Sequence, residues 1–457
     1  MLFNSQAFVL GFLPCVLVLY YACARARTAR LLLLVVASLL FYAAWDARFV
    51  PALVGLTLLN WAVARAFGRW RRRILLDCGI LLNLGVLGLC KYANFFAAGW
   101  ATLFGIPHDP WAIILPLGVS FFTFQKIGYL VDLRRGARPI YGLLEFSAFV
   151  TFFPVLIAGP LVRHDEIVAQ LQADPRGPGL WENLGRGGVL FILGFAKKAA
   201  LADTMALVCD PLYARAAQGT LNLAEAWAAA GTYALQIYFD FSGYSDMAVG
   251  LALMLGLRIP LNFNAPYRAT SIRDFWRRWH MTLSRFLRDY VYVPLGGNRQ
   301  GAWRQAANVV LTMLLGGLWH GAGWTFVAWG GLHGVALAIN GVWHRAGLRM
   351  PALLGGALTL LFVILCWVPF RAPDFPTAWR VIEGLAGLHG VGRVKVDNAA
   401  VVVIAAVLAV AGPTSQSLAL ALLRPSRWLA PLAGAALVGL LLLAGGRMAN
   451  EFIYFQF

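Results

Sequence analysis

The sequence predicts an all-α protein that crosses a membrane many times. Hydrophobic residues fill 60% of its 457 positions, charged residues fill only 13%, and the mean hydropathy is +0.70. A soluble domain carries about 25% charged residues, so this chain lacks the polar surface that water would demand. Its apolar runs, such as 31–44 and 400–411, are continuous, whereas a transmembrane β-barrel alternates polar and apolar residues. The length suits roughly ten to twelve spanning helices.

Apolar runs of about twenty residues place the candidate spans. They cover approximately 8–24, 31–45, 50–67, 74–90, 112–131, 144–162, 187–208, 226–257, 306–320, 324–346, 352–370, 398–413 and 430–446, and some of them must be re-entrant or interfacial. Basic clusters follow the first, third and fifth runs, at 25–30, 69–73 and 134–138. Since positive loops stay in the cytoplasm, we expect the N-terminus outside and the first run to be a retained span.

The net charge of +18 does not indicate a nucleic-acid partner. The arginines interrupt the apolar runs and form no separate basic domain, which is typical of membrane topology. The six cysteines form no CxxC pair, so we expect buried thiols and no metal site. With no visible internal repeat, residues 1–457 are predicted to form a single integral-membrane domain.

Residues 271–290 have the pattern of an amphipathic interfacial helix. At helical spacing, one side is apolar and the other polar, with Arg273, Arg277, His280, Ser284 and Arg288 on the polar face. A helix at the membrane surface that fixes topology would explain this pattern. Alternatively, the polar face lines the entrance of a site and brings His280 inward.

His320 lies in a stretch, about 306–346, that otherwise looks like membrane. A full charge at the bilayer centre costs roughly 2.5–3.5 kcal/mol, so an ionisable residue there usually faces a cavity or a site. Imidazole also suits general-base catalysis near neutral pH. The flanking Trp319 and Trp324 offer rigid walls, although a histidine bonded to a backbone carbonyl is the structural alternative. For Asp240 and Asp246 we favour a structural role in which each carboxylate is paired, because a carboxylate beside an apolar run needs a partner.

Long motifs along the chain resemble those of the membrane-bound O-acyltransferases, and more closely the bacterial alginate O-acetylase branch. The matching stretches are Pro116–Gln125, Phe153–Pro160 with Arg163, Tyr238–Asp246, Asn262–Asn264 with Pro266–Tyr267, Phe275–His280, Asp289–Asn298, Leu318–Trp324 and Phe452–Phe457. The resemblance implies about 11 transmembrane helices with re-entrant or interfacial helices and a central tunnel. It places the family's near-invariant histidine at His320 and its second polar position at His280.

The resemblance also implies a function. An acetyl group would pass from a cytoplasmic donor, acetyl-CoA, across a cell inner membrane for O-acetylation of an exported polysaccharide such as alginate. Periplasmic acetyltransferase proteins would be partners, membrane lipid would surround the chain, and no cofactor would stay bound. With His320 and His280 as catalytic residues, we expect substrate contacts from Trp319, Trp324, Arg277, Ser284, Asn264 and Asp240.

Three other functions remain open at this point. The first is transfer of D-alanine or another acyl group onto a cell-wall polymer, which donor dependence would distinguish. A transporter of the donor or polymer would keep working without His320 as a base. A purely structural subunit fits poorly with two histidines in these motifs.

Overall fold

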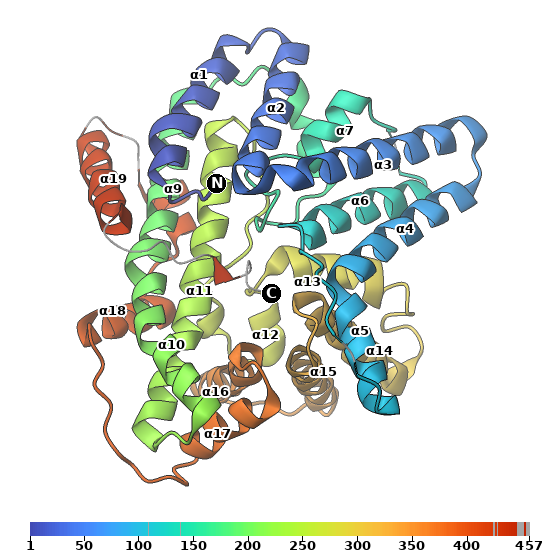
Figure 1. The fold of residues 1–457 in the computed structure, drawn as a ribbon. Helices are drawn as coiled ribbons and strands as arrows, with labels where there is room; N and C mark the ends of the chain where they lie inside the picture. Colours follow the sequence, from blue (N-terminus) through green and yellow to red (C-terminus); the bar gives the residue numbers. More distant parts are fainter. Residues whose placement is uncertain (108, 138, 424–425, 427, 446–451, 454–457) are drawn as a thin grey trace. The chain divides into compact units, whose positions relative to one another are not determined.

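The computed structural model describes every residue except 108, 138, 424–425, 427, 446–451 and 454–457. All regular elements of the described residues are helices, as predicted (Figure 1). The chain forms two compact units: the first contains residues 1–193, 244–260 and 419–449, and the second contains 194–243, 261–418 and 450–457. The prediction of a single integral domain stays a prediction.

The first unit contains the N-terminal helices and one helix near the C-terminus. They are η1 (Ala7–Phe12), α1 (Leu13–Ala22), α2 (Arg27–Asp46), η2 (Ala47–Phe49), α3 (Val50–Trp70), α4 (Arg73–Leu87), η3 (Gly88–Tyr92), α5 (Ala93–Phe104), α6 (Val119–Arg134), α7 (Leu143–Val150), α8 (His164–Ile167), η4 (Gln170–Gln172), most of α9 (Leu180–Ala196) and α19 (Leu429–Gly445).

The predicted span 144–162 is wrong in its second half. Helix α7 ends at Val150, and residues 151–162 are buried without regular helix. Prolines at 154 and 160 interrupt helical hydrogen bonding here. Ser38 of α2 accepts a bond from the Phe153 amide at 3.1 Å. The segment is therefore an irregular buried connection, the kind tolerated at membrane depth only where protein or a cavity surrounds it.

A buried histidine cluster also belongs to the first unit. The Tyr141 hydroxyl lies 2.9 Å from His164 Nδ1, and Asp132 Oδ2 lies 3.3 Å from His164 Nε2. Tyr129 packs edge-on against the same imidazole, with ring centres 5.1 Å apart. Both ring nitrogens of His164 thus have polar partners, which is how a buried histidine is normally stabilised.

The second unit contains most of the remaining elements. They are η5 (Lys197–Ala202), α10 (Asp203–Gln218), the first part of α11 (Leu223–Met254), η6 (Pro266–Arg268), α12 (Ile272–Trp276), α13 (Met281–Leu287), η7 (Arg288–Tyr292), α14 (Gly301–His320), α15 (Trp324–Arg345), α16 (Ala352–Arg371), α17 (Phe375–Leu385) and α18 (Ala399–Val410).

Helices α14 and α15 form a tight hairpin because glycines face each other across it. A Cβ atom at Gly317 would clash with the Phe326 carbonyl oxygen, and one at Gly330 would clash with that of Met313. Small residues let two membrane helices approach to backbone contact, where van der Waals packing is strong. The hairpin fixes the end of α14, and therefore His320, against α15.

The predicted continuous helix over 271–290 is wrong. Helix α12 ends at Trp276, a turn covers 277–280, and α13 begins at Met281. His280 adopts φ 43° and ψ 51°, the left-handed region, which no helix tolerates inside it. Periodicity predicted the apolar face correctly, since Phe275 and Trp279 are buried, but it gave no sign of the break.

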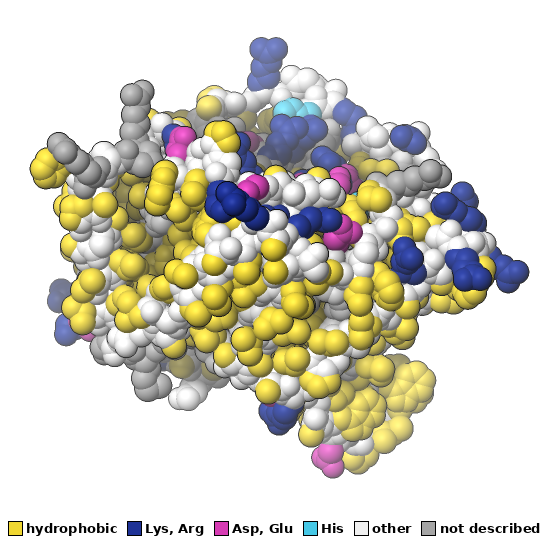
Figure 2. Space-filling view, turned by 90° about the horizontal axis from the view of Figure 1, so that it is seen from above, with side chains coloured by type: hydrophobic (Ala, Val, Ile, Leu, Met, Phe, Trp, Pro, Cys, Tyr) yellow, Lys and Arg dark blue, Asp and Glu magenta, His cyan; other side chains and the backbone are white. Residues whose placement is uncertain are grey.

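Apolar side chains cover much of the face seen in Figure 2. By length and composition, four helical stretches of the described chain can cross a membrane, namely Arg27–Trp70, Arg73–Phe104, Trp324–Arg345 and Ala352–Arg371. Exposed apolar residues such as Leu353 and Leu103 would cost free energy in water. The chain is therefore a multi-pass membrane protein, while its number of crossings stays a prediction.

Candidate active site

The turn between α12 and α13 holds His280 in place. The Met281 amide donates to the Asn262 carbonyl at 2.9 Å, and the Asn264 amide donates to the Arg278 carbonyl at 2.9 Å. These bonds tie residues 262–264 to the turn on both sides of His280. A left-handed conformation costs a non-glycine residue about 1–3 kcal/mol and persists only when its surroundings fix it. Such strain often marks a functional position.

Asn262 also determines which nitrogen of His280 carries the proton. Its Oδ1 accepts bonds from the Thr282 hydroxyl at 2.9 Å and the Thr282 amide at 3.3 Å. The same oxygen lies 3.1 Å from His280 Nδ1. Because this oxygen is an acceptor, Nδ1 must be the donor, and the neutral ring then keeps its lone pair on Nε2. Nε2 is consequently the basic nitrogen.

The imidazole of His280 is fully buried among aromatic rings. Phe241 of α11 packs perpendicular to it, with ring centres 4.6 Å apart. Burial lowers the pKa of His280, because desolvation penalises the charged imidazolium. The residue is therefore neutral at physiological pH, the form that can accept a proton.

His320 ends α14 and points into a second set of aromatic rings. Trp329 of α15 lies perpendicular to it at 5.1 Å between centres, and Phe370 of α16 lies at 5.3 Å. Trp319 contacts it at 4.9 Å. After His320 the chain leaves the helix with an extended Gly321. Three helices thus fix the position of this imidazole.

The two histidines are neighbours. Their ring centres lie 6.4 Å apart, with the ring planes inclined at 57°. Trp319 contacts both, since its ring lies 6.2 Å from that of His280. Two imidazoles at this separation can act on the same small group: one accepts a proton while the other orients a substrate or stabilises developing charge.

Comparison with known proteins identifies the family of the chain. The model of the membrane-bound O-acyltransferase family matches residues 130–368, which include both histidines. The chain belongs to the membrane-bound O-acyltransferase family. It is therefore an acyltransferase, and the helical membrane architecture agrees with that.

Several relatives in this family align over most of the chain. The peptidoglycan O-acetyltransferase of Helicobacter pylori is 38% identical over 86% of this chain and 81% of its own length. The probable alginate O-acetylase AlgI of Pseudomonas aeruginosa is 42% identical over 84% of this chain and 75% of its own. The teichoic acid D-alanyltransferase of Streptococcus thermophilus is 32% identical over half of this chain and 57% of its own length. The predicted alginate O-acetylase branch is confirmed.

The other predicted site residues lie in different surroundings. Trp319 is buried beside both histidines, whereas Trp324, at the start of α15, is 63% exposed. Arg277 and Asn264 are exposed. Ser284 is half-buried, and its hydroxyl donates to the Trp279 carbonyl at 3.4 Å. The predicted substrate contacts of all six residues stay predictions.

Asp240 takes part in an ion pair. Lys198 Nζ lies 2.7 Å from Asp240 Oδ1 and 2.9 Å from Asp203 Oδ1. The Ile453 amide donates to Asp240 Oδ2 at 2.9 Å. The carboxylate thereby anchors part of the C-terminal motif predicted over 452–457, of which residues 454–457 lie outside the described part. This geometry favours the structural alternative for Asp240.

Sequence reasoning missed several residues that shape the site. Asn262 lies within one of the matching motifs, but its near neighbour Asn264 is the predicted site residue. Trp329 and Phe370 lie on the spans after His320, and only their aromatic character distinguishes them in the sequence. Lys198 is a lysine in a predicted span, where a charge needs a buried partner. Among the missed residues, it is the one with a clear signal in the sequence.

Proposed function

We propose that the chain moves acetyl groups across a bacterial inner membrane for O-acetylation of an exported polysaccharide. The observation that carries the proposal is the adjacent, buried pair His280 and His320, 6.4 Å apart between ring centres. Names of relatives add the substrate class, since two of them are O-acetyltransferases of peptidoglycan and of alginate.

His320 acts as the general base in this proposal. As the acceptor hydroxyl attacks the thioester carbonyl, the imidazole takes the hydroxyl proton; the carbon–sulfur bond then breaks and the thiolate receives that proton. A positioned base contributes roughly 10²–10⁴-fold to the rate. His280, with its lone pair on Nε2, lies close enough to orient the donor or to accept the proton in a second step.

Acetyl-CoA would be the cytoplasmic donor, a substrate and not a bound cofactor. Arg277 and Arg273 are exposed beside the His280 turn, and guanidinium groups pair well with phosphate. Periplasmic acetyltransferase proteins would receive the acetyl group and deliver it to the polymer. The polymer is identified by finding which exported polysaccharide carries the acetyl ester.

A D-alanyl transfer is the second candidate function. Teichoic acid D-alanyltransferases match half or more of the chain, at 32% and 24% identity. The same pair of histidines would serve either acyl group, because both reactions need a hydroxyl deprotonated as it attacks an acyl thioester. The two candidates differ in the ester that appears on the polymer.

The test uses a deletion strain complemented with wild type, His320→Ala or His389→Ala at matched membrane levels. Acetyl and D-alanyl esters on exported polysaccharide are measured. His389 is a suitable control, because it is an exposed histidine whose ring contacts Glu383, 3.3 Å away. We expect acetyl esters with wild type and His389→Ala, and none with His320→Ala.

Each other outcome has a definite meaning. Full acetylation with His320→Ala would reject His320 as the base and favour transport without chemistry. D-alanyl esters in place of acetyl esters would select the second candidate. Unchanged ester content after deletion would reject both.

A further inference from the structure

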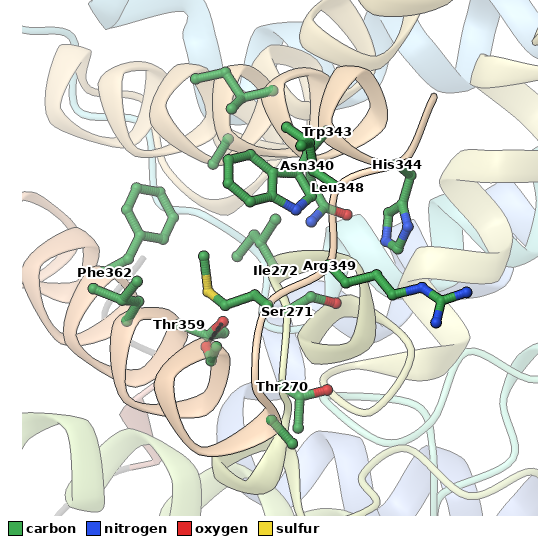
Figure 3. Close-up of a pocket in the computed structure, with 16 residues that line it drawn as sticks. Thr270, Ser271, Ile272, Asn340, Trp343, His344, Leu348, Arg349, Thr359 and Phe362 are labelled. Atoms are coloured by element: carbon green, nitrogen blue, oxygen red, sulfur yellow. Dashed lines mark hydrogen bonds between the residues drawn. The ribbon is translucent and has the colours of Figure 1, made fainter. Parts of the chain in front are cut away.

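A groove separate from the histidine pair lies in the second unit, between α15 and α16 (Figure 3). Its volume is about 800 Å³, within the usual range of ligand sites, about 300–1,000 Å³. Thr270 and Ser271, just before α12, close one side. A Cβ atom at Gly355 would lie 2.5 Å from the Thr270 carbonyl oxygen, so only glycine lets α16 seal the groove there.

The two ends of the groove differ in polarity. His344 and Arg349 lie at one end, and Phe362 lies at the other (Figure 3). Leu358 and Ile339 line the wall between these ends. None of the described lining residues is acidic. A ligand that fits this groove has a negatively charged head and an apolar tail.

The groove opens toward hydrocarbon. Ile339 is 61% exposed and Leu358 is 47% exposed, and both lie on helices long and apolar enough to span a membrane. Exposed leucine and isoleucine on a spanning helix face lipid tails. A water-soluble anion would have to pass this apolar rim, whereas a lipid can enter it sideways from the bilayer.

The charged end faces the leaflet where anionic lipids gather. Arg345 ends α15, Arg349 follows it, and Arg299 and Arg304 flank the start of α14, which pairs antiparallel with α15. By the positive-inside rule this end is cytoplasmic. The cytoplasmic leaflet has a negative surface potential that attracts basic residues near the membrane.

Asn340 provides a further polar contact inside the groove. It projects from α15 among the lining side chains (Figure 3). Its Oδ1 is buried and has no hydrogen-bond partner among the described residues. Buried polar atoms are normally satisfied. A hydroxyl of a glycerol headgroup would supply the missing donor.

We propose that this groove binds one anionic phospholipid, phosphatidylglycerol, with its phosphate at Arg349 and an acyl chain running along Leu358 toward Phe362. The site does not depend on the acetyl-transfer proposal. It lies next to the catalytic pair, since Phe362 packs edge-on against His333 at 5.4 Å, His333 contacts Trp329 at 4.9 Å, and Trp329 contacts His320. A bound lipid would therefore support the wall behind the site.

The test measures lipid bound to the purified full-length chain by native mass spectrometry. Phosphatidylglycerol and phosphatidylcholine with the same acyl chains are titrated separately. Arg349→Gln removes the head contact, and Arg393→Gln, at an exposed arginine away from the groove, is its control. We expect wild type and the control to retain phosphatidylglycerol preferentially, and Arg349→Gln to bind it about fivefold more weakly, the effect of one arginine near a membrane surface.

Filling the groove gives an independent result. Ala336→Trp places an indole in the wall, and Leu358→Trp does so from the exposed rim if the first variant fails to fold. Either should remove the tightest lipid site for both headgroups. Equal retention of the two lipids by wild type, or unchanged phosphatidylglycerol binding in Arg349→Gln and a filled variant, would overturn the proposal. So would displacement of the lipid by coenzyme A, which would make the groove a donor site.

Discussion

The buried histidines of the two units have opposite surroundings. In the first unit, His164 has Tyr141 2.9 Å from one ring nitrogen and Asp132 3.3 Å from the other. In the second unit, Asn262 fixes one nitrogen of His280, and aromatic rings and a second histidine lie beside its imidazole. His164 thus contacts two polar side chains, whereas the ring of His280 packs against aromatic side chains.

The difference shows why burial alone does not identify a catalytic histidine. His164 uses both nitrogens for protein contacts, so it joins helices and has no capacity left for a substrate. Asn262 orients His280 at Nδ1, and the ring centre of His320 lies 6.4 Å from that of His280. Both residues are buried, and from their different contacts we propose a structural role for His164 and a chemical role for His280.

The largest expected effect comes from the histidine pair. His280→Gln should lower acyl transfer by roughly 10²–10⁴-fold if His280 takes part in proton transfer. Because residues that act as a unit are not additive, the His280→Gln, His320→Gln double variant should be little worse than either single variant. Product formation by purified protein in vesicles measures this. Effects that multiply would show that the two histidines act independently.

A smaller effect should follow from Asn262→Leu. The substitution leaves His280 without the acceptor that sets its tautomer, which costs about 1–3 kcal/mol, or roughly a five- to hundredfold loss of rate. Asn83→Leu is the matched control, because Asn83 is also a buried asparagine, and its side chain bonds to Asn60 in the first unit. Equal losses in the two variants would contradict the assigned role of Asn262.

The sequence predicted the class of fold and the two histidines, but not how they meet. Composition and long apolar runs require a helical membrane protein whatever the detailed packing. The break at Arg277–His280 depends on bonds to Asn262. Because Asn262 lies outside residues 271–290, the periodicity of that segment could not reveal the break. Likewise, Phe370 reaches His320 only through the packing of α16, and Lys198 reaches Asp240 from another helix.

The smallest effect is expected in the first unit. Tyr141→Phe removes the hydroxyl beside His164 Nδ1, which should lower the free energy of unfolding by about 0.5–1.5 kcal/mol. Thermal unfolding in detergent should show a midpoint lower by a few degrees, roughly 2–4 °C, with acyl transfer by the folded protein unchanged. A large loss of transfer with normal stability would give the His164 cluster a chemical role.

The most direct measurement compares acyl transfer by His320→Gln and His164→Gln, each purified at the same concentration of folded protein. The two substitutions are chemically identical and differ only in the surroundings of the histidine. We predict that His320→Gln is at least about a hundredfold slower than wild type. His164→Gln should stay within about twofold of the wild-type rate and should be less stable. Full activity in His320→Gln, or an equal loss in both variants, would contradict the assignment of the active site.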